Sequence, residues 1–258
     1  FETALRLAPD NLAALADKAA ALRALGRLDE ELECLRKLAA TEPKHAAVWM
    51  RIGEIQVQRR NLAEALRSFD RALSLDSDLV PAMLHKAMTL ALMEKWRDAI
   101  KTAEAATRVM PESKEVWHTL GEVSRRAGRY RAAMRALRKA AEIDPEDAAV
   151  EHSMGMVAYE AGDLREAVSH FKRAEVRDRK NVTILRSLAL THMKLEDWQE
   201  ARSAWERLTA IERRDPDIFD AKAVVCAKLN DFCGAAEAWE RARKLYKQRG
   251  DEKNAHRV

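Results

Sequence analysis

The stretch Trp49-Met50-Arg51-Ile52-Gly53 returns in altered form as Trp117-His118-Thr119-Leu120-Gly121, two steps of 34 residues further along the chain. Each stretch places an aromatic, an aliphatic and a small residue at i, i+3 and i+4, which is the spacing of one face of an α-helix. The same register, numbered 1 to 34 in each unit, predicts seven repeat units over residues 12–249. They start at Leu12, Ala46, Val80, Lys114, Ala148, Val182 and Pro216.

Small residues and turn residues recur in phase within this register. Position 8 is small in every unit, as expected where two helices approach closely: Ala19, Gly53, Ala87, Gly121, Gly155, Ala189 and Ala223. Position 15 holds Gly26, Gly128 and Gly162, where a first helix must turn into a second one. Position 32 holds proline, which ends a helix, in four units: Pro9, Pro43, Pro111 and Pro145. Each unit is therefore predicted to be a helix, a short turn and an antiparallel helix.

The composition agrees with an all-α protein. Of the 258 residues, 47% are hydrophobic and 34% charged, and there are only 8 Gly and 6 Pro. These values argue against a disordered chain, a membrane protein, an all-β fold and a Rossmann-type fold. The net charge of +4 is mild. Three cysteines (Cys34, Cys226 and Cys233) are too few for a disulfide framework, which favours a reducing, cytoplasmic location.

The pattern W-x2-L-G, then A-x3-F, then P resembles the tetratricopeptide repeat (TPR). Trp49 to Gly53 with Ala65 and Phe69, and Trp117 to Gly121 with Ala133 and Pro145, are the best copies. The sequence departs from the pattern at position 20, where Glu31 replaces a small residue, and at position 4, where Glu151 replaces tryptophan. The resemblance implies a right-handed α-solenoid, a superhelix of antiparallel helix pairs.

The register also makes predictions about both ends of the chain. Residues 1–11 fall on the second helix of a preceding unit, and residues 250–258 on the start of a further unit or a polar cap. An apolar surface left open at Phe1 leads us to expect end-to-end self-association.

Twelve of the fourteen aromatic residues fall at positions 4, 17 and 24, which are packing positions between helices. Only Tyr159 and Tyr246 lie elsewhere. We therefore predict that the tryptophans form core contacts and do not stack on a ligand.

The resemblance further implies that the first helices line a concave groove that binds a partner peptide or helix. The side chains expected in this groove are Met50, Arg51, Leu84, His85, Met88, His118, Glu122, Arg125, Arg126, His152, Met156, Tyr159, Arg186, Leu190 and Met193. Flexible methionines suit the apolar face of a partner, and the arginines suit its carboxylates. The leading prediction is a non-enzymatic protein–protein interaction scaffold.

Two alternatives remain open at this stage. Residues 125–139 carry six arginines and one lysine with no acidic residue, a stripe that would bind nucleic acid in a salt-dependent way. In the second alternative, the array is the regulatory arm of a larger enzyme. No catalytic motif is present, and we predict no cofactor. His118 and His152 share position 5, but two histidines without a third ligand give little support to a metal site.

Overall fold

The computed structural model describes residues 11–258, which form fifteen α-helices and contain no strand. The prediction of an all-α chain is confirmed. The chain divides into two compact blocks, Phe1–Ala136 and Leu137–Val258, which are described separately. Most of the predicted tail of a preceding unit, including Phe1 and Pro9, lies outside the described residues.

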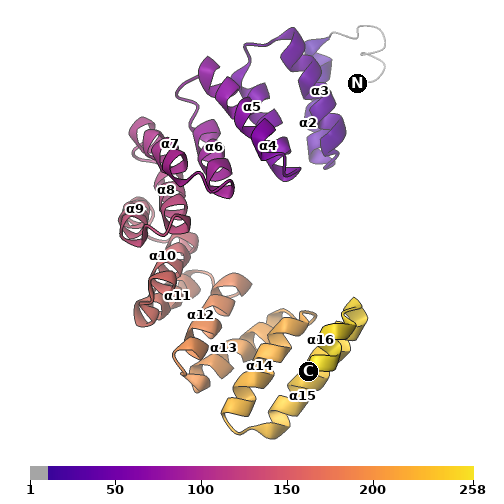
Figure 1. Cartoon of the computed structure of the whole chain (residues 1–258), viewed down its shortest axis with the longest axis vertical. Helices are drawn as coiled ribbons and strands as arrows, with labels where there is room; N and C mark the ends of the chain where they lie inside the picture. Colours follow the sequence, from indigo (N-terminus) through magenta and orange to yellow (C-terminus); the bar gives the residue numbers. More distant parts are fainter. Residues whose placement is uncertain (1–10) are drawn as a thin grey trace. The chain divides into compact units, whose positions relative to one another are not determined.

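The N-terminal block consists of helix pairs joined by short turns (Figure 1). Its helices are α2 (Leu12–Ala24), α3 (Leu28–Thr41), α4 (Ala46–Gln58), α5 (Leu62–Leu75), α6 (Val80–Leu92), α7 (Trp96–Val109) and α8 (Lys114–Arg126). Each helix packs against the next one along the chain, and α4 also touches α6, as α6 touches α8. The boundary between the blocks falls within α9 (Tyr130–Ile143).

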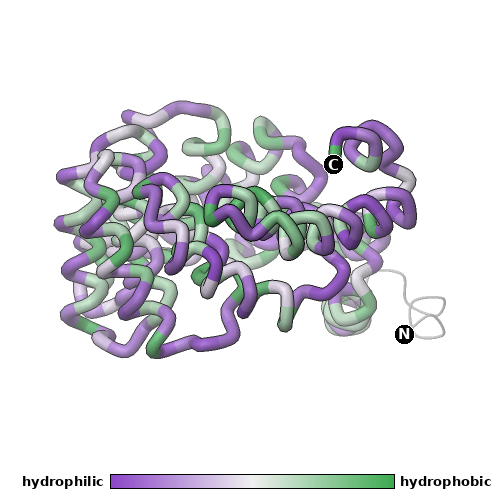
Figure 2. Tube along the Cα trace, turned by 90° about the horizontal axis from the view of Figure 1, so that it is seen from below, coloured by the Kyte–Doolittle hydropathy of each residue, from purple (hydrophilic) through white to green (hydrophobic). Residues whose placement is uncertain are grey.

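The C-terminal block continues with α10 (Ala148–Ala161), α11 (Leu164–Arg177), α12 (Val182–Lys194), α13 (Trp198–Ile211), α14 (Pro216–Lys228), α15 (Phe232–Arg249) and α16 (Glu252–Arg257). Successive helices again pack side by side, and α10 touches α12. Within residues 11–258, no helix combines the length and the apolar character needed to cross a membrane. Hydrophobic and hydrophilic residues alternate along the helices, as amphipathic packing requires (Figure 2).

The turn inside each helix pair has one fixed geometry. All seven residues at position 15 have a positive φ, between 58° and 95°: Gly26, Arg60, Glu94, Gly128, Gly162, Glu196 and Asn230. Glycine adopts this left-handed conformation without strain, whereas arginine and glutamate pay a steric cost. The conformation is therefore imposed by the helix pair and not by the residue.

Position 8 is small because an aromatic ring lies directly over it in two pairs. A Cβ atom added at Gly53 would lie 2.5 Å from Cε1 of Phe69, and one added at Gly155 would lie 2.5 Å from Cε1 of Phe171. Both rings are fully buried. The paired positions 8 and 24 thus fix how closely the two helices approach.

Most aromatic residues pack between helices as predicted. The indole N–H groups of Trp49 and Trp117 donate to the carbonyl oxygens of Pro43 and Pro111, at 3.0 and 2.7 Å. Phe232 is an exception, because its side chain is 69% exposed. Its equivalent Trp198 is covered by Lys228 of the following first helix, but the helix that follows α15 has only six residues.

Candidate functional site

In the N-terminal block, the face of the first helices carries a continuous chain of ion pairs. Arg51 of α4 donates to both carboxylate oxygens of Glu31 of α3, at 2.6 and 2.8 Å. Its remaining terminal nitrogen donates to Glu54 at 2.8 Å. Glu54 in turn lies 3.1 Å from Nε2 of His85 on α6. Four side chains from three helices are therefore linked to one another.

This arrangement fixes the charge state of the two central groups. The hydrogen bonds with Glu31 raise the pKa of Arg51 above its already high value. Burial works to raise the pKa of Glu54, but the hydrogen bonds from His85 and Arg51 outweigh it and lower that pKa to about 2. Arg51 is 14% exposed and fully engaged, so a partner's carboxylate would have to displace an internal one.

The sequence contained a signal for this network that concerned Glu31. A carboxylate at the otherwise small position 20 is buried, at 1% exposure, and so requires a charged partner. That partner is Arg51 at position 6 of the following first helix. The departure from the repeat pattern and the predicted groove arginine are thus two ends of one interaction.

The apolar groove residues of this block are half-buried and pack against its core. Leu84 packs against the cluster of Val80, Met83 and Val116. Met88 packs against the cluster that includes Ala87 and Val123. Met50 is half-buried as well. Each of these side chains therefore exposes only part of its surface to solvent.

On α8 the predicted residues are also engaged, with one exception. Arg125 pairs with Glu122 at 2.9 Å, and each side chain is less than one-fifth exposed. His118 is half-buried and also interacts with another group of the protein. Arg126 is exposed.

In the C-terminal block, three predicted residues make polar contacts within the first-helix face. Arg186 of α12 donates to Asp215, the N-cap residue of α14, at 2.6 Å. Nε2 of His152 lies 2.9 Å from the Ser187 hydroxyl, which also lies 3.9 Å from the sulfur of Met156. These contacts connect α10 to α12 and α12 to α14.

Two further predicted residues have contacts on one side and solvent on the other. The ammonium group of Lys194 lies 4.5 Å from the ring centroid of Tyr159. The sulfur of Met193 accepts a hydrogen bond from the indole of Trp205 at 3.2 Å. Both Tyr159 and Met193 remain half-exposed.

Leu190 and Val224 form the most open apolar part of this face. Leu190 on α12 is 43% exposed, and Val224 on α14 is 37% exposed. Both occupy position 9 of neighbouring first helices. Val224 shares position 9, one of the positions expected to contact a partner, with Leu190 and Met156. We call Met156, Leu190, Met193 and Val224 the apolar surface of the C-terminal block.

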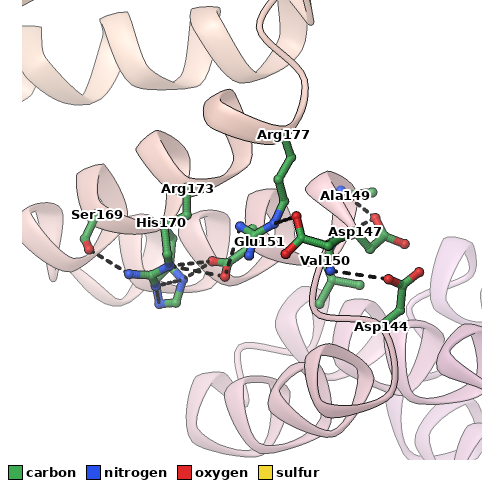
Figure 3. A network of polar contacts seen from close by, with 10 residues as sticks. Asp144, Asp147, Ala149, Val150, Glu151, Ser169, His170, Arg173 and Arg177 are labelled. Carbon is green, nitrogen blue, oxygen red and sulfur yellow. Dashed lines mark hydrogen bonds and ion pairs between the residues drawn. The ribbon is translucent and has the colours of Figure 1, made fainter.

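Glu151, the residue that replaces tryptophan at position 4, is buried and lies at the centre of an ion cluster (Figure 3). Arg173 and Arg177 from α11 approach its carboxylate, at 3.1 and 3.5 Å, and Nδ1 of His170 lies 2.8 Å away. Burial works to raise the pKa of Glu151, but the hydrogen bonds from His170 and Arg173 lower it below its ordinary value. Asp147 beside it caps α10 by accepting from the backbone of Ala149 and Val150. The cluster links α10 to α11.

The arginine stripe is only partly available for binding. Arg125 is paired with Glu122, and Lys139 is paired with Glu142 at 2.6 Å. The other members are exposed: Arg126, Arg129, Arg131, Arg135 and Arg138. Across residues 11–258, no three His, Cys, Asp or Glu side chains are grouped in a way that could hold a metal ion.

Comparison with family models places two parts of the chain among repeat proteins of one kind. Residues 106–218 match the TPR domain of cytochrome c-type biogenesis protein H, and residues 32–80 match a tetratricopeptide repeat model. No curated protein sequence matches the chain.

Solved structures show the same fold at low sequence identity. A tetratricopeptide repeat protein from Parabacteroides merdae is 16% identical, with a TM-score of 0.71, over 95% of this chain and 97% of that one. PilF of Pseudomonas aeruginosa is 18% identical, with a TM-score of 0.65, over 78% and 92% of the two chains. YrrB, described as a TPR protein with an unusual peptide-binding site, is 22% identical, with a TM-score of 0.53, over 74% and 98%.

Proposed function

Because the chain belongs to the tetratricopeptide repeat family, whose fold generally serves as a non-catalytic scaffold for protein–protein interaction, we propose that it is an adaptor that binds a segment of a partner protein on its first helices. The observation that carries this proposal is the exposure of Leu190 and Val224 at one position of neighbouring helices. Exposed apolar side chains that lie together on the surface of a protein favour contact with another protein.

The chemistry of the proposed surface suits an apolar segment. Met156 and Met193 are flexible and adapt to the shape of a partner side chain. Lys194 and Lys228 directly follow Met193 and Ala227 in the sequence and are exposed. Their ammonium groups can therefore attract carboxylates of a partner bound to this surface. The face of the N-terminal block, by contrast, neutralises its own charges through Arg51 and Glu54.

A peptide-display selection tests this proposal. Immobilised chain selects from a random peptide library, and the affinity of enriched peptides is measured by fluorescence anisotropy. We expect Leu190→Glu combined with Val224→Glu to weaken binding at least tenfold, because each change places a charge against an apolar contact. Val176→Glu is the matched control, since Val176 is 71% exposed but lies on a second helix. Equal loss in the control, or full binding by the double variant, would overturn the proposal.

We propose that residues 12–249 form seven repeat units. We also propose a cytoplasmic location, which the free thiols of Cys34, Cys226 and Cys233 support. Nucleic-acid binding by the stripe is not favoured. A strong salt dependence of binding to a duplex, lost on Arg131→Glu with Arg135→Glu, would restore it.

A further inference from the structure

A pocket of about 590 Å³ opens in the N-terminal block between the second helices α5 and α7. The first helix α6 packs against both of them and contributes positions 4, 7 and 11 to the lining. None of the lining residues is among the predicted groove residues, so the pocket is distinct from the first-helix face. Its apolar lining consists of Leu66, Leu73, Met83, Leu90 and Ala105.

The volume of this pocket follows the residue at position 4 of the first helix. Equivalent pockets, lined by positions 4, 7 and 11 of their own first helix, open beside α4 and α14. The volume is about 250 Å³ beside Trp49, 450 Å³ beside Phe219 and 590 Å³ beside Met83. It grows as the ring at position 4 becomes smaller and is then lost. With Met83, residues 11–258 leave open a space that an indole occupies beside α4.

The neighbouring units show how an indole is held at this place. Trp49 and Trp117 each donate their indole N–H to the carbonyl oxygen of the proline at position 32. The residue at position 32 before α6 is Ser77, which lines the pocket. Its carbonyl oxygen accepts no hydrogen bond from the described part of the chain. The pocket therefore combines an apolar space with an acceptor for an indole N–H.

The lining carries more cations than acids, with three lysines against two aspartates. Lys86 pairs with Asp70 at 2.6 Å. Lys95 and Lys101 are exposed and form no ion pair with another residue in the range 11–258. Asp98 is the second acidic lining residue. A carboxylate that accompanies an inserted ring would therefore meet two ammonium groups.

We propose that this pocket receives a tryptophan side chain of a partner protein, from a segment that carries a carboxylate beside the tryptophan. Removal of the ring from water supplies the affinity. The Ser77 carbonyl favours a ring that has an N–H group, and Lys95 and Lys101 favour the acidic neighbour. Because only residues 66–105 take part, the proposal does not depend on the apolar surface of the C-terminal block.

The pocket can be filled from within the chain. Met83→Trp places at position 4 the residue that α4 and α8 carry there. Val109→Trp is the matched control, because Val109 lies on α7, is 38% exposed and does not line the pocket. Lys101→Glu reverses a lining charge, and Arg108→Glu reverses an exposed charge on the same helix outside the pocket. The helical circular dichroism signal and the urea midpoint of each variant verify folding.

The test is a random peptide-display selection on the full chain carrying Leu190→Glu and Val224→Glu, which disable the surface used by the proposed function. We expect enriched peptides to share a Trp next to an Asp or Glu. Met83→Trp should weaken their binding at least tenfold in fluorescence anisotropy, and Val109→Trp should leave it within twofold. Lys101→Glu should weaken binding and make the preferred neighbour of the Trp basic, whereas Arg108→Glu should do neither.

Several outcomes would overturn the proposal. They are undiminished binding to Met83→Trp, equal loss in Val109→Trp, and an unchanged charge preference after Lys101→Glu. Failure to enrich any peptide that contains tryptophan would overturn it as well. If the chain then self-associates in sedimentation, and both Met83→Trp and Phe232→Ser abolish this association, the occupant is the exposed Phe232 of a second copy of this chain.

Discussion

The close approach of helices at position 8 can be tested by adding a single methyl group. Gly53→Ala would place a Cβ atom 2.5 Å from Cε1 of Phe69 and 2.8 Å from Cδ1 and Cζ, well inside van der Waals contact. The ring is fully buried. Alanine in place of glycine favours a helix by about 1 kcal/mol. Overpacking of this kind costs roughly 1–3 kcal/mol. Because three ring atoms are too close, we expect a net destabilisation of about 1–2 kcal/mol.

The chain itself provides the compensating change. Ala19 and Leu35 occupy positions 8 and 24 of the first helix pair, so alanine opposite leucine is an arrangement that this fold accepts. Gly53→Ala with Phe69→Leu reproduces that arrangement. We expect the double variant to be more stable, by about 1 kcal/mol or more, than the sum of the two single effects predicts.

Urea unfolding followed by circular dichroism at 222 nm measures the four free energies of the cycle. Repeat proteins can unfold in parts, so hydrogen exchange of α4 and α5 should localise the loss. Gly155→Ala would place a Cβ atom 2.5 Å from the Phe171 ring, so we expect a similar destabilisation, located in α10 and α11. Wild-type stability of Gly53→Ala, or additive effects in the cycle, would refute the packing argument.

Three further predictions follow from single groups. Glu94→Gly should raise the free energy of unfolding by about 0.5 kcal/mol, since relief of a left-handed φ of 58° outweighs the flexibility of glycine, and a lowered urea midpoint would contradict this. The pKa of Glu54 is lowered from 4.5 to about 2, so its contribution of about 3 kcal/mol is present above pH 4.5 and is lost as the pH falls toward 2. Glu54→Gln should therefore flatten the decline of stability over that range, and an unchanged slope would refute the assignment. Burial and a hydrogen bond to Asp217 raise the pKa of Tyr246. In a titration followed by absorbance at 295 nm, which detects ionised tyrosine, one phenol should therefore stay protonated at pH 11. Tyr246→Phe should remove that fraction, and its persistence would contradict the prediction.

The helices and their pairing could be predicted because the information is local and repeated. A small residue at position 8, a turn residue at position 15 and proline at position 32 each act within a few residues of their own place. Even where Arg60 and Glu94 replace glycine, the neighbouring units indicate that a turn is present. Repetition therefore compensates for a weak signal in any one unit.

The state of the candidate contact residues could not be predicted in the same way. Arg51 and Arg186 occupy groove positions by sequence, but one is engaged by Glu31 and Glu54 and the other by Asp215. These partners lie on other helices or at their caps, and their reach depends on side-chain conformation. Phe232 shows the same limit, because its exposure depends on the helix that follows its own pair.

The sequence by itself determined the all-α class, the register of 34 residues and the family, since each unit repeats the same short-range pattern of small, large and turn residues. Only the tertiary structure decided which predicted groove residues remain open to a partner. It engages Arg51 and Arg125 in ion pairs and leaves Leu190 and Val224 exposed. The physical reason is that exposure and ion pairing depend on side chains from neighbouring helices, which a pattern read along one helix does not contain.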